Sequence, residues 1–226
     1  CVIEQNQPKG FGFTKVPGFL DPVRMLTIAV TGLTGHLGLN IIGKPKPGNT
    51  LLVSGAAGAT GSVVGQVGKI KGCRVIGIAG GPEKCAWLQS KLNFDGTIDY
   101  KNEDVGERIK TLCPDGVDIF YDNVGGEILE LALNNLARRA RVVLCGAISQ
   151  YSNAPNKGPT YANAYGIRNL MQLVMKHATM EGFVLTDYRA HFNTGIMQLN
   201  SWVDKGQLVL NHEMEAGFDN IPQTLQ

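Results

Sequence analysis

The chain has 226 residues, of which 43% are hydrophobic and 18% charged, and its formal net charge is +2. This length and apolar fraction are typical of a globular protein with one large domain, or with one domain and an appendage. A charge so close to zero gives no indication of nucleic acid or of an anionic membrane as a partner.

The first part of the chain is expected to hold a connecting segment and one helix. Residues 1–24 are rich in Pro and Gly, which favours irregular structure. Residues 34–42 predict a helix with Thr34 as its N-cap. No apolar stretch reaches about 18 uninterrupted residues, so we expect no transmembrane helix. The chain begins at Cys1 with no initiator Met, which suggests the interior of a longer protein.

Residues 51–65 are the most informative segment. An apolar run at 51–53 is typical of a buried strand, and apolar residues at helical spacing follow four glycines, Gly55, Gly58, Gly61 and Gly65. Strand, glycine turn and helix in this order are the fingerprint of a dinucleotide-binding turn. The glycines let the backbone approach a pyrophosphate, and the helix N-terminus offers free N–H groups and a positive dipole. A tight turn that binds nothing is the alternative.

The next strand bears on the choice of cofactor. Residues 74–79 are apolar and lie about 20 residues beyond the turn, where a site for NAD usually ends the strand in Asp or Glu. Here Gly80, Gly81 and Pro82 follow the strand, and Lys84 comes shortly after. A carboxylate would repel a 2′-phosphate, whereas an ammonium pairs with it, so the sequence favours NADP(H). For Lys84, an ordinary solvated lysine is the alternative.

The middle of the chain alternates strands and helices. Strands are expected near 50–54, 74–79, 96–99, 117–121 and 141–145, with helices near 60–71, 83–92, 103–112 and 126–136. This alternation predicts an α/β fold with a doubly wound parallel sheet, covered by helices on both faces. Ligands of such sheets bind at the carboxyl ends of the strands.

The C-terminal third extends this pattern. Residues 150–165 are rich in Asn, Pro, Gly and Tyr and predict a loop over the mouth of the site. A helix near 166–176 and a strand near 179–185 would extend the sheet, and a helix over 188–205 would end at Gly206. The chain has five scattered cysteines, Cys1, Cys73, Cys85, Cys113 and Cys145, and none of them has Cys-x-x-Cys spacing. We therefore expect reduced thiols of a cytoplasmic protein rather than a zinc site or a disulfide framework.

Six motifs, in one order, resemble a known family. They lie at 55–66, 81–84, 99–101, 121–127, 145–151 and 181–183. Together they are similar to the zinc-independent medium-chain reductases of the prostaglandin reductase (leukotriene B4 dehydrogenase) and alkenal double-bond reductase group, over about residues 27–222. The resemblance implies a dinucleotide-binding Rossmann domain over 27–226. It also implies that residues 1–26 are a segment leading from a mostly absent N-terminal GroES-like domain, of which they are a remnant.

The resemblance also implies a role for each matched residue. The pyrophosphate would lie on Gly58, Ala59, Thr60 and Gly61. Lys84 and Tyr100 would flank the 2′-phosphate, and Asn123 would hydrogen-bond the cofactor. The nicotinamide side would be lined by Cys145, Gly146, Ala147, Ile148, Ser149 and Tyr151, and by the backbone of Phe183, Val184 and Leu185. The alternative for Tyr100 is an ordinary aromatic residue at a strand end, and that for Asn123 is a turn residue. Cys145 is expected to contribute its backbone rather than a reactive thiol.

The sequence departs from the family pattern at several positions. Zinc-dependent relatives carry a Cys ligand just before the helix at 34–42, and residues 29–34 contain none, so we expect no metal site. His36 stands where many members have an aromatic residue near the substrate, so it is a substrate-side candidate together with Tyr151. A packed or solvated histidine is the alternative. Met175 stands where members carry a tyrosine proposed to orient the substrate, so no catalytic acid is assigned.

The resemblance implies that NADPH delivers hydride to the β-carbon of an α,β-unsaturated aldehyde or ketone, with the protein contributing orientation and exclusion of water. Two alternatives remain: a quinone reductase of the zeta-crystallin type, and a cofactor-binding fragment without turnover. The family also implies a homodimer paired through the sheet edge near 179–185, with a small molecule as the substrate and neither nucleic acid nor membrane as a partner.

Overall fold

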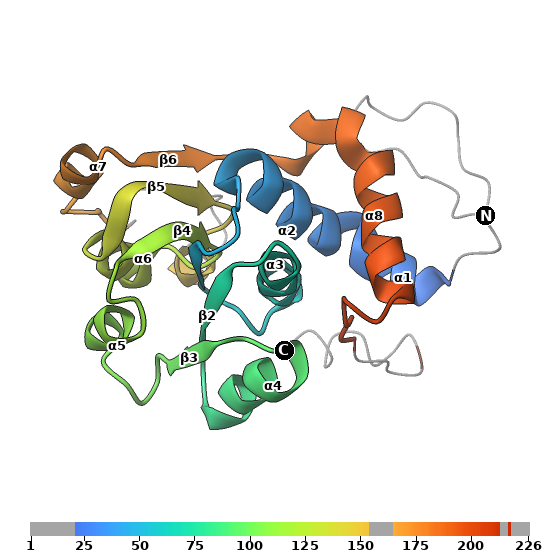
Figure 1. Cartoon of the computed structure of the whole chain (residues 1–226), viewed down its shortest axis with the longest axis horizontal. Helices are drawn as coiled ribbons and strands as arrows, with labels where there is room; N and C mark the ends of the chain where they lie inside the picture. Colours follow the sequence, from blue (N-terminus) through green and yellow to red (C-terminus); the bar gives the residue numbers. More distant parts are fainter. Residues whose placement is uncertain (1–20, 154–164, 213–216, 218–226) are drawn as a thin grey trace.

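The computed structural model describes residues 21–153, 165–212 and 217. Six parallel strands form one sheet in the order β3-β2-β1-β4-β5-β6 (Figure 1). Their bounds are β1 Thr50–Val53, β2 Arg74–Ala79, β3 Gly96–Asp99, β4 Val117–Asp122, β5 Leu136–Leu144 and β6 Thr179–Gly182. The strand order reverses direction between β1 and β4, as in a doubly wound sheet. The predicted fold class is therefore confirmed.

Helices cover both faces of the sheet (Figure 1). One apolar core lies between the sheet and the helices α3 Ala59–Ile70, α4 Pro82–Leu92, α8 Phe192–Asp204 and a long helix over Pro22–Gly43. The other core lies under α5 Val105–Leu112, α6 Gly126–Leu133 and α7 Met171–Lys176. Short 3₁₀ segments span Ile148–Asn153 and Leu185–His191.

The long helix differs from the sequence expectation at its start. It runs through α1 Pro22–Thr27, a π-helical stretch Ile28–Gly32, α2 Leu33–Leu37 and a second π-helical stretch Gly38–Gly43. Its N-cap is Asp21, whose carboxylate accepts a hydrogen bond from the Val23 N–H at 3.1 Å. Thr34 lies inside the helix and donates its hydroxyl to the Val30 carbonyl at 2.7 Å, so its prediction as the N-cap is wrong. The Asp-Pro pair is the true start signal.

This helix is long and apolar enough to cross a membrane by length and composition alone. Its mean hydropathy is 1.5, and 56% of the tested window is buried inside the protein. A Cβ added to Gly35 would lie 3.0 Å from Val64 of α3, and one added to Gly32 would lie 3.5 Å from Leu199 of α8. Close packing against two core helices therefore accounts for its apolar composition.

Other element bounds also shift. The helix expected over 126–136 ends at Leu133, because β5 begins at Leu136 and passes through a bulge at Arg139, where φ is +64°. β6 ends at Gly182 instead of 185, α7 begins at Met171 instead of 166, and α8 begins at Phe192 instead of 188. Of the loop predicted at 150–165, residues 154–164 lie outside the described residues.

The N-terminal segment is described only from residue 21. Residues 1–20, which carry most of the predicted GroES-like remnant, lie outside the described part of the chain, so that remnant stays a prediction. The expected boundary between residues 26 and 27 falls within the long helix, where Met25 is buried.

Candidate functional site

A cleft of about 1050 Å³ opens at the carboxyl ends of the strands, where the strand order reverses. Its walls come from the turns that follow β1, β2, β3 and β4 and from the segment after β5. The structure thus brings to one place nine of the residues expected from sequence: Gly58, Ala59, Thr60, Gly61, Lys84, Tyr100, Asn123, Ile148 and Ser149.

The β1–α3 turn forms the floor of the cleft. Gly55 has a φ of +57°, which glycine adopts without strain. Gly58 is the N-cap of α3, and no side chain caps this helix. The first N–H groups of a helix have no partner within it, so those of Ala59, Thr60 and Gly61 are available to an anion.

Two glycines of this turn, Gly58 and Gly61, have different structural roles. A Cβ added to Gly58 would meet only the Gly55 carbonyl oxygen, at 3.3 Å, so its other side is open toward a ligand. A Cβ added to Gly61 would lie 2.3 Å from the same oxygen and 2.8 Å from the Ala56 Cα. The close approach of helix and turn therefore requires glycine at 61 independently of any ligand.

A buried polar cluster joins the ends of β1 and β4. The Asp122 carboxylate is fully buried and accepts hydrogen bonds from the Ser54 hydroxyl at 2.7 Å and from the N–H groups of Val124 and Gly125. Burial raises the pKa of Asp122, while these donors oppose the rise. Asn123 donates its side-chain amide to the Ser54 carbonyl at 2.7 Å, so its amide oxygen is the atom placed to meet a ligand.

The segment after β5 is tied to the same turn. The N–H groups of Cys145 and Gly146 donate to the Asp122 carbonyl at 2.9 and 3.2 Å. The Ser149 hydroxyl donates to the Val124 carbonyl at 2.6 Å. Burial raises the pKa of the Cys145 thiol, so it stays protonated at neutral pH, as expected of a packed cysteine.

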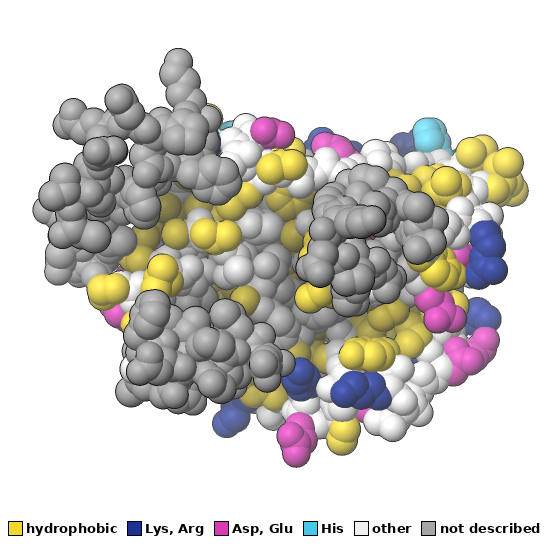
Figure 2. Space-filling model, turned by 180° about the vertical axis from the view of Figure 1, so that it is seen from behind, with side chains coloured by type: hydrophobic (Ala, Val, Ile, Leu, Met, Phe, Trp, Pro, Cys, Tyr) yellow, Lys and Arg dark blue, Asp and Glu magenta, His cyan; other side chains and the backbone are white. Residues whose placement is uncertain are grey.

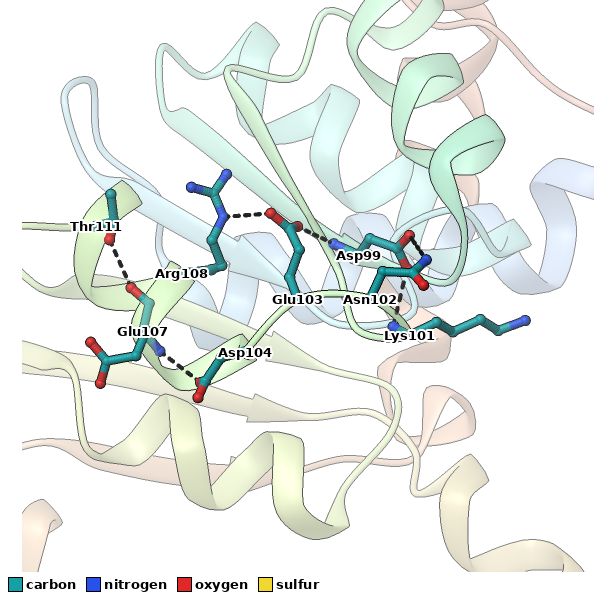
Figure 3. Close-up of polar contacts among 8 residues, drawn as sticks. All are labelled: Asp99, Lys101, Asn102, Glu103, Asp104, Glu107, Arg108 and Thr111. Carbon is teal, nitrogen blue, oxygen red and sulfur yellow. Dashed lines mark hydrogen bonds and ion pairs between the residues drawn. The ribbon is translucent and has the colours of Figure 1, made fainter.

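The wall formed by the turns after β2 and β3 is basic and aromatic. Lys84 and Lys101 line it, together with Tyr100, whose ring packs so closely on Gly80 that an added Cβ there would lie 2.8 Å from it. The acids of this wall are held by other groups: Glu103 pairs with Arg108 at 2.8 Å, and Asp104 caps α5 (Figure 3). No cofactor-binding role was assigned to Lys101 from the sequence, although its position directly after Tyr100 could have indicated one.

Seven expected residues do not line this cleft: Cys145, Gly146, Ala147, Tyr151, Phe183, Val184 and Leu185. Tyr151 is 65% exposed, and its hydroxyl accepts from the Ala147 N–H at 3.2 Å. The Phe183 ring packs against Gly38 of the long helix. The cofactor roles of these residues stay predictions.

His36 lies in the core between α2 and α8. It is 4% exposed, stands edge-on to the Trp202 ring at 5.4 Å, and its Nδ1 lies 3.1 Å from the Asn40 amide nitrogen. Burial, and then the charge of Lys71, lower the pKa of His36 to about 4. His36 does not line the cleft, which favours the packed interpretation over contact with a substrate.

No group of three or more His, Cys, Asp or Glu side chains could hold a metal ion within the part of the chain that the structure describes. Four cysteines of that part, Cys73, Cys85, Cys113 and Cys145, are free thiols.

Comparisons with known proteins match this geometry. Residues 59–201 match the family described as zinc-binding dehydrogenase. The Bacillus subtilis protein YfmJ is 45% identical over 196 residues, which cover 86% of this chain and 56% of YfmJ. Prostaglandin reductase 1 of Bos taurus is 36% identical, with 87% of this chain and 58% of the relative covered. The crystal structure of CurA with NADPH from Vibrio vulnificus superposes with a TM-score of 0.80 at 38% identity, covering 93% of this chain and 62% of CurA.

Proposed function

The chain belongs to the zinc-independent medium-chain dehydrogenases/reductases of the prostaglandin reductase and alkenal reductase group, and from this we propose that it binds NADP(H) for a reductase of conjugated carbon–carbon double bonds. The chain spans 56% of the length of YfmJ and 58% of that of the bovine reductase. The substrates we propose are α,β-unsaturated aldehydes or ketones.

One observation carries the choice of cofactor. A cradle of uncapped N–H groups at α3 and a wall bearing Lys84, Tyr100 and Lys101 line the same cleft. The cradle suits a pyrophosphate, and the two ammonium groups suit a second anionic group at the far end. The Glu103 carboxylate also lines the cleft, but it pairs with the Arg108 guanidinium at 2.8 Å, which compensates its charge.

NADPH, when bound, supplies the hydride that the β-carbon of the substrate receives. The chain's own residues would bind and orient the cofactor. The α3 N–H groups would hold the pyrophosphate, and the Asn123 oxygen, fixed by the bond of its amide to Ser54, would accept a hydrogen bond nearer the reacting end. The segment 145–149 is fixed to the same turn and would form the wall that keeps water from this end.

Calorimetric titration of this chain with NADPH and NADH tests the cofactor. We expect NADPH to bind at least about tenfold more tightly, equivalent to roughly 1.4 kcal/mol. Lys84→Ala should erase much of this difference. Lys91→Ala, at an exposed site in the last turn of the same helix, should leave it intact. Equal affinities for the two cofactors in the unmutated chain would overturn the proposal.

The reaction itself is tested by following NADPH consumption in the full-length protein. Faster turnover with enals and enones than with quinones, and negligible alcohol oxidation, would support the proposal. Preference for quinones would support the zeta-crystallin type of reductase instead. Tight binding without turnover of any acceptor would indicate a cofactor-binding protein. Residues 29–34 contain no cysteine, whereas zinc-dependent relatives carry a zinc ligand there. We therefore expect the activity to resist chelators and elemental analysis to find no zinc.

A further inference from the structure

Asp99, the last residue of β3, is a buried acidic residue directly before Tyr100 and Lys101 of the cleft wall, and the sequence motifs left it without a role. It is 8% exposed. Its carboxylate accepts a hydrogen bond from the Gly81 N–H at 2.8 Å. It also accepts from the Lys101 N–H at 3.1 Å and from the Asn102 side-chain amide at 2.7 Å (Figure 3). The bond from Gly81 contributes most to lowering the pKa of Asp99, so this group is ionised at neutral pH.

These bonds join two separate turns. Gly81 is the N-cap of α4 and has a φ of +95°, and Lys84 lies in the first turn of that helix. Lys101 belongs to the turn after β3. The Asp99 carboxylate therefore holds the start of α4, which carries Lys84, close to the backbone of Lys101.

The tyrosine between these turns is fixed by the same arrangement. The Tyr100 N–H donates to the Ala79 carbonyl at 3.1 Å, and its ring lies against Gly80. Tyr100 is half-exposed on the cleft side. Its position thus depends on the spacing between the Gly80-Gly81 turn and the end of β3, which Asp99 sets.

The charge arrangement removes the obvious objection that an acid here would repel a phosphate. The Asp99 carboxylate is surrounded by three donors, and the neighbouring Glu103 accepts from the Asp99 N–H at 2.7 Å and pairs with Arg108. In Figure 3 the Lys101 side chain extends away from the Glu103–Arg108 pair. The negative charges are bound within the turn, and the ammonium groups are presented at its surface.

We propose that Asp99 is a positioning residue for cofactor selection, which sets Lys84, Tyr100 and Lys101 at the spacing that distinguishes a 2′-phosphorylated adenosine from an unphosphorylated one. The inference rests on the proposed NADP(H) site. It assigns selectivity to the hydrogen bonds of the carboxylate and not to its charge.

Two substitutions separate hydrogen bonding from charge. Asp99→Ala removes both side-chain acceptor oxygens and keeps the backbone carbonyl, which accepts from the N–H groups of Asn102 and Glu103. Asp99→Asn keeps an oxygen for Gly81 and Lys101, and Asn102 can turn its own amide oxygen toward the new NH₂ group. The affinities of NADPH, NADH, 2′,5′-ADP and 5′-AMP would be measured by calorimetry on the intact chain. Asp118→Ala is the matched control, because Asp118 accepts the Thr50 N–H at 2.8 Å at the opposite ends of the strands.

We expect Asp99→Ala to lose at least about tenfold in affinity for NADPH and 2′,5′-ADP, with NADH and 5′-AMP changed by less than about twofold. Asp99→Asn should retain most of the selectivity, and Asp118→Ala should retain all of it while lowering the melting temperature. Stronger NADPH binding in both Asp99 variants would show that the charge only repels phosphate, and would overturn the proposal. A parallel loss for all four ligands would overturn it as well.

The failure of this inference is distinct from that of the proposed function. If the unmutated chain does not prefer NADPH to NADH, the cofactor assignment itself is wrong. If the preference is present and Asp99→Ala keeps it, only the role of Asp99 is wrong. If Asp99→Ala does not fold, Asn102→Ala removes a single arm of the network at an exposed residue. It should reduce selectivity by a few-fold, and unchanged selectivity there would count against the proposal.

Discussion

At the scale of single residues, sequence identified the glycines of the turn but not their separate duties. Gly58 and Gly61 look alike in the motif, and only the three-dimensional distance to the Gly55 oxygen separates them. The same holds for His36, whose burial against Trp202 depends on residues far apart in the chain. The place of Lys84 at the cleft was predictable from a local signal, a strand end without an acid followed by a cation, whereas Tyr100 was assigned from the family resemblance.

The two glycines should respond differently to alanine. Gly61→Ala places a methyl group 2.3 Å from backbone that cannot move away cheaply. The gain in helix propensity of about 1 kcal/mol is smaller than the cost of such an overlap, which we expect to be a few kcal/mol. Gly58→Ala should fold with near-normal stability and bind NADPH more weakly. Thermal unfolding and calorimetry check both, and a Gly61→Ala protein as stable as the parent would contradict the assignment.

At the scale of elements, the alternation of strands and helices was predictable because buried parallel strands are apolar runs and the helices between them repeat at 3.6 residues. The start of the long helix was missed because Asp21-Pro22 lies at the edge of a segment rich in Pro and Gly. The start of β5 was missed because Arg138 and Arg139 interrupt its apolar pattern at the bulge. Both errors concern boundaries, where tertiary packing outweighs local preference.

The contact between α2 and α8 predicts a pH effect on stability. The pKa of His36 is lowered from 6.5 to about 4, so the folded state favours the neutral ring. The unfolded chain then binds the proton first as the pH falls, and stability is full above pH 6.5 and declines down to about pH 4. The loss should be on the order of 3 kcal/mol.

Other groups also titrate in acid, and the raised pKa of Asp122 acts in the opposite direction. The measurement is therefore the difference between the unfolding free energies of the parent and of His36→Gln, taken by urea unfolding across this range. The difference should change steeply between pH 6.5 and 4 and stay constant above it. A flat difference would show that folding does not lower the pKa of His36.

At the scale of the whole molecule, the doubly wound sheet and a cleft at the carboxyl ends of its strands were predictable from the alternation of strands and helices. Pairing through the sheet edge near 179–185 was implied by the family resemblance and stays a prediction. Among the described residues, β6 pairs only with β5, so it is one of the two edge strands of the sheet, the other being β3. Beside it, α7 exposes Met171, Val174 and Met175, and Val184 just beyond the strand is 62% exposed. Figure 2 shows hydrophobic side chains gathered at the end of the molecule that carries α7.

An edge strand with unpaired backbone groups next to apolar side chains is suited to pairing with a second copy. We therefore expect a homodimer whose two sheets join at β6. Val184→Arg should convert it to a monomer, because two-fold symmetry brings both new charges to the same apolar contact. Met197→Arg is the control: Met197 is 73% exposed but belongs to α8. Sedimentation of the three proteins decides the point, since a dimer that survives Val184→Arg and dissociates with Met197→Arg would place the interface on α8 instead.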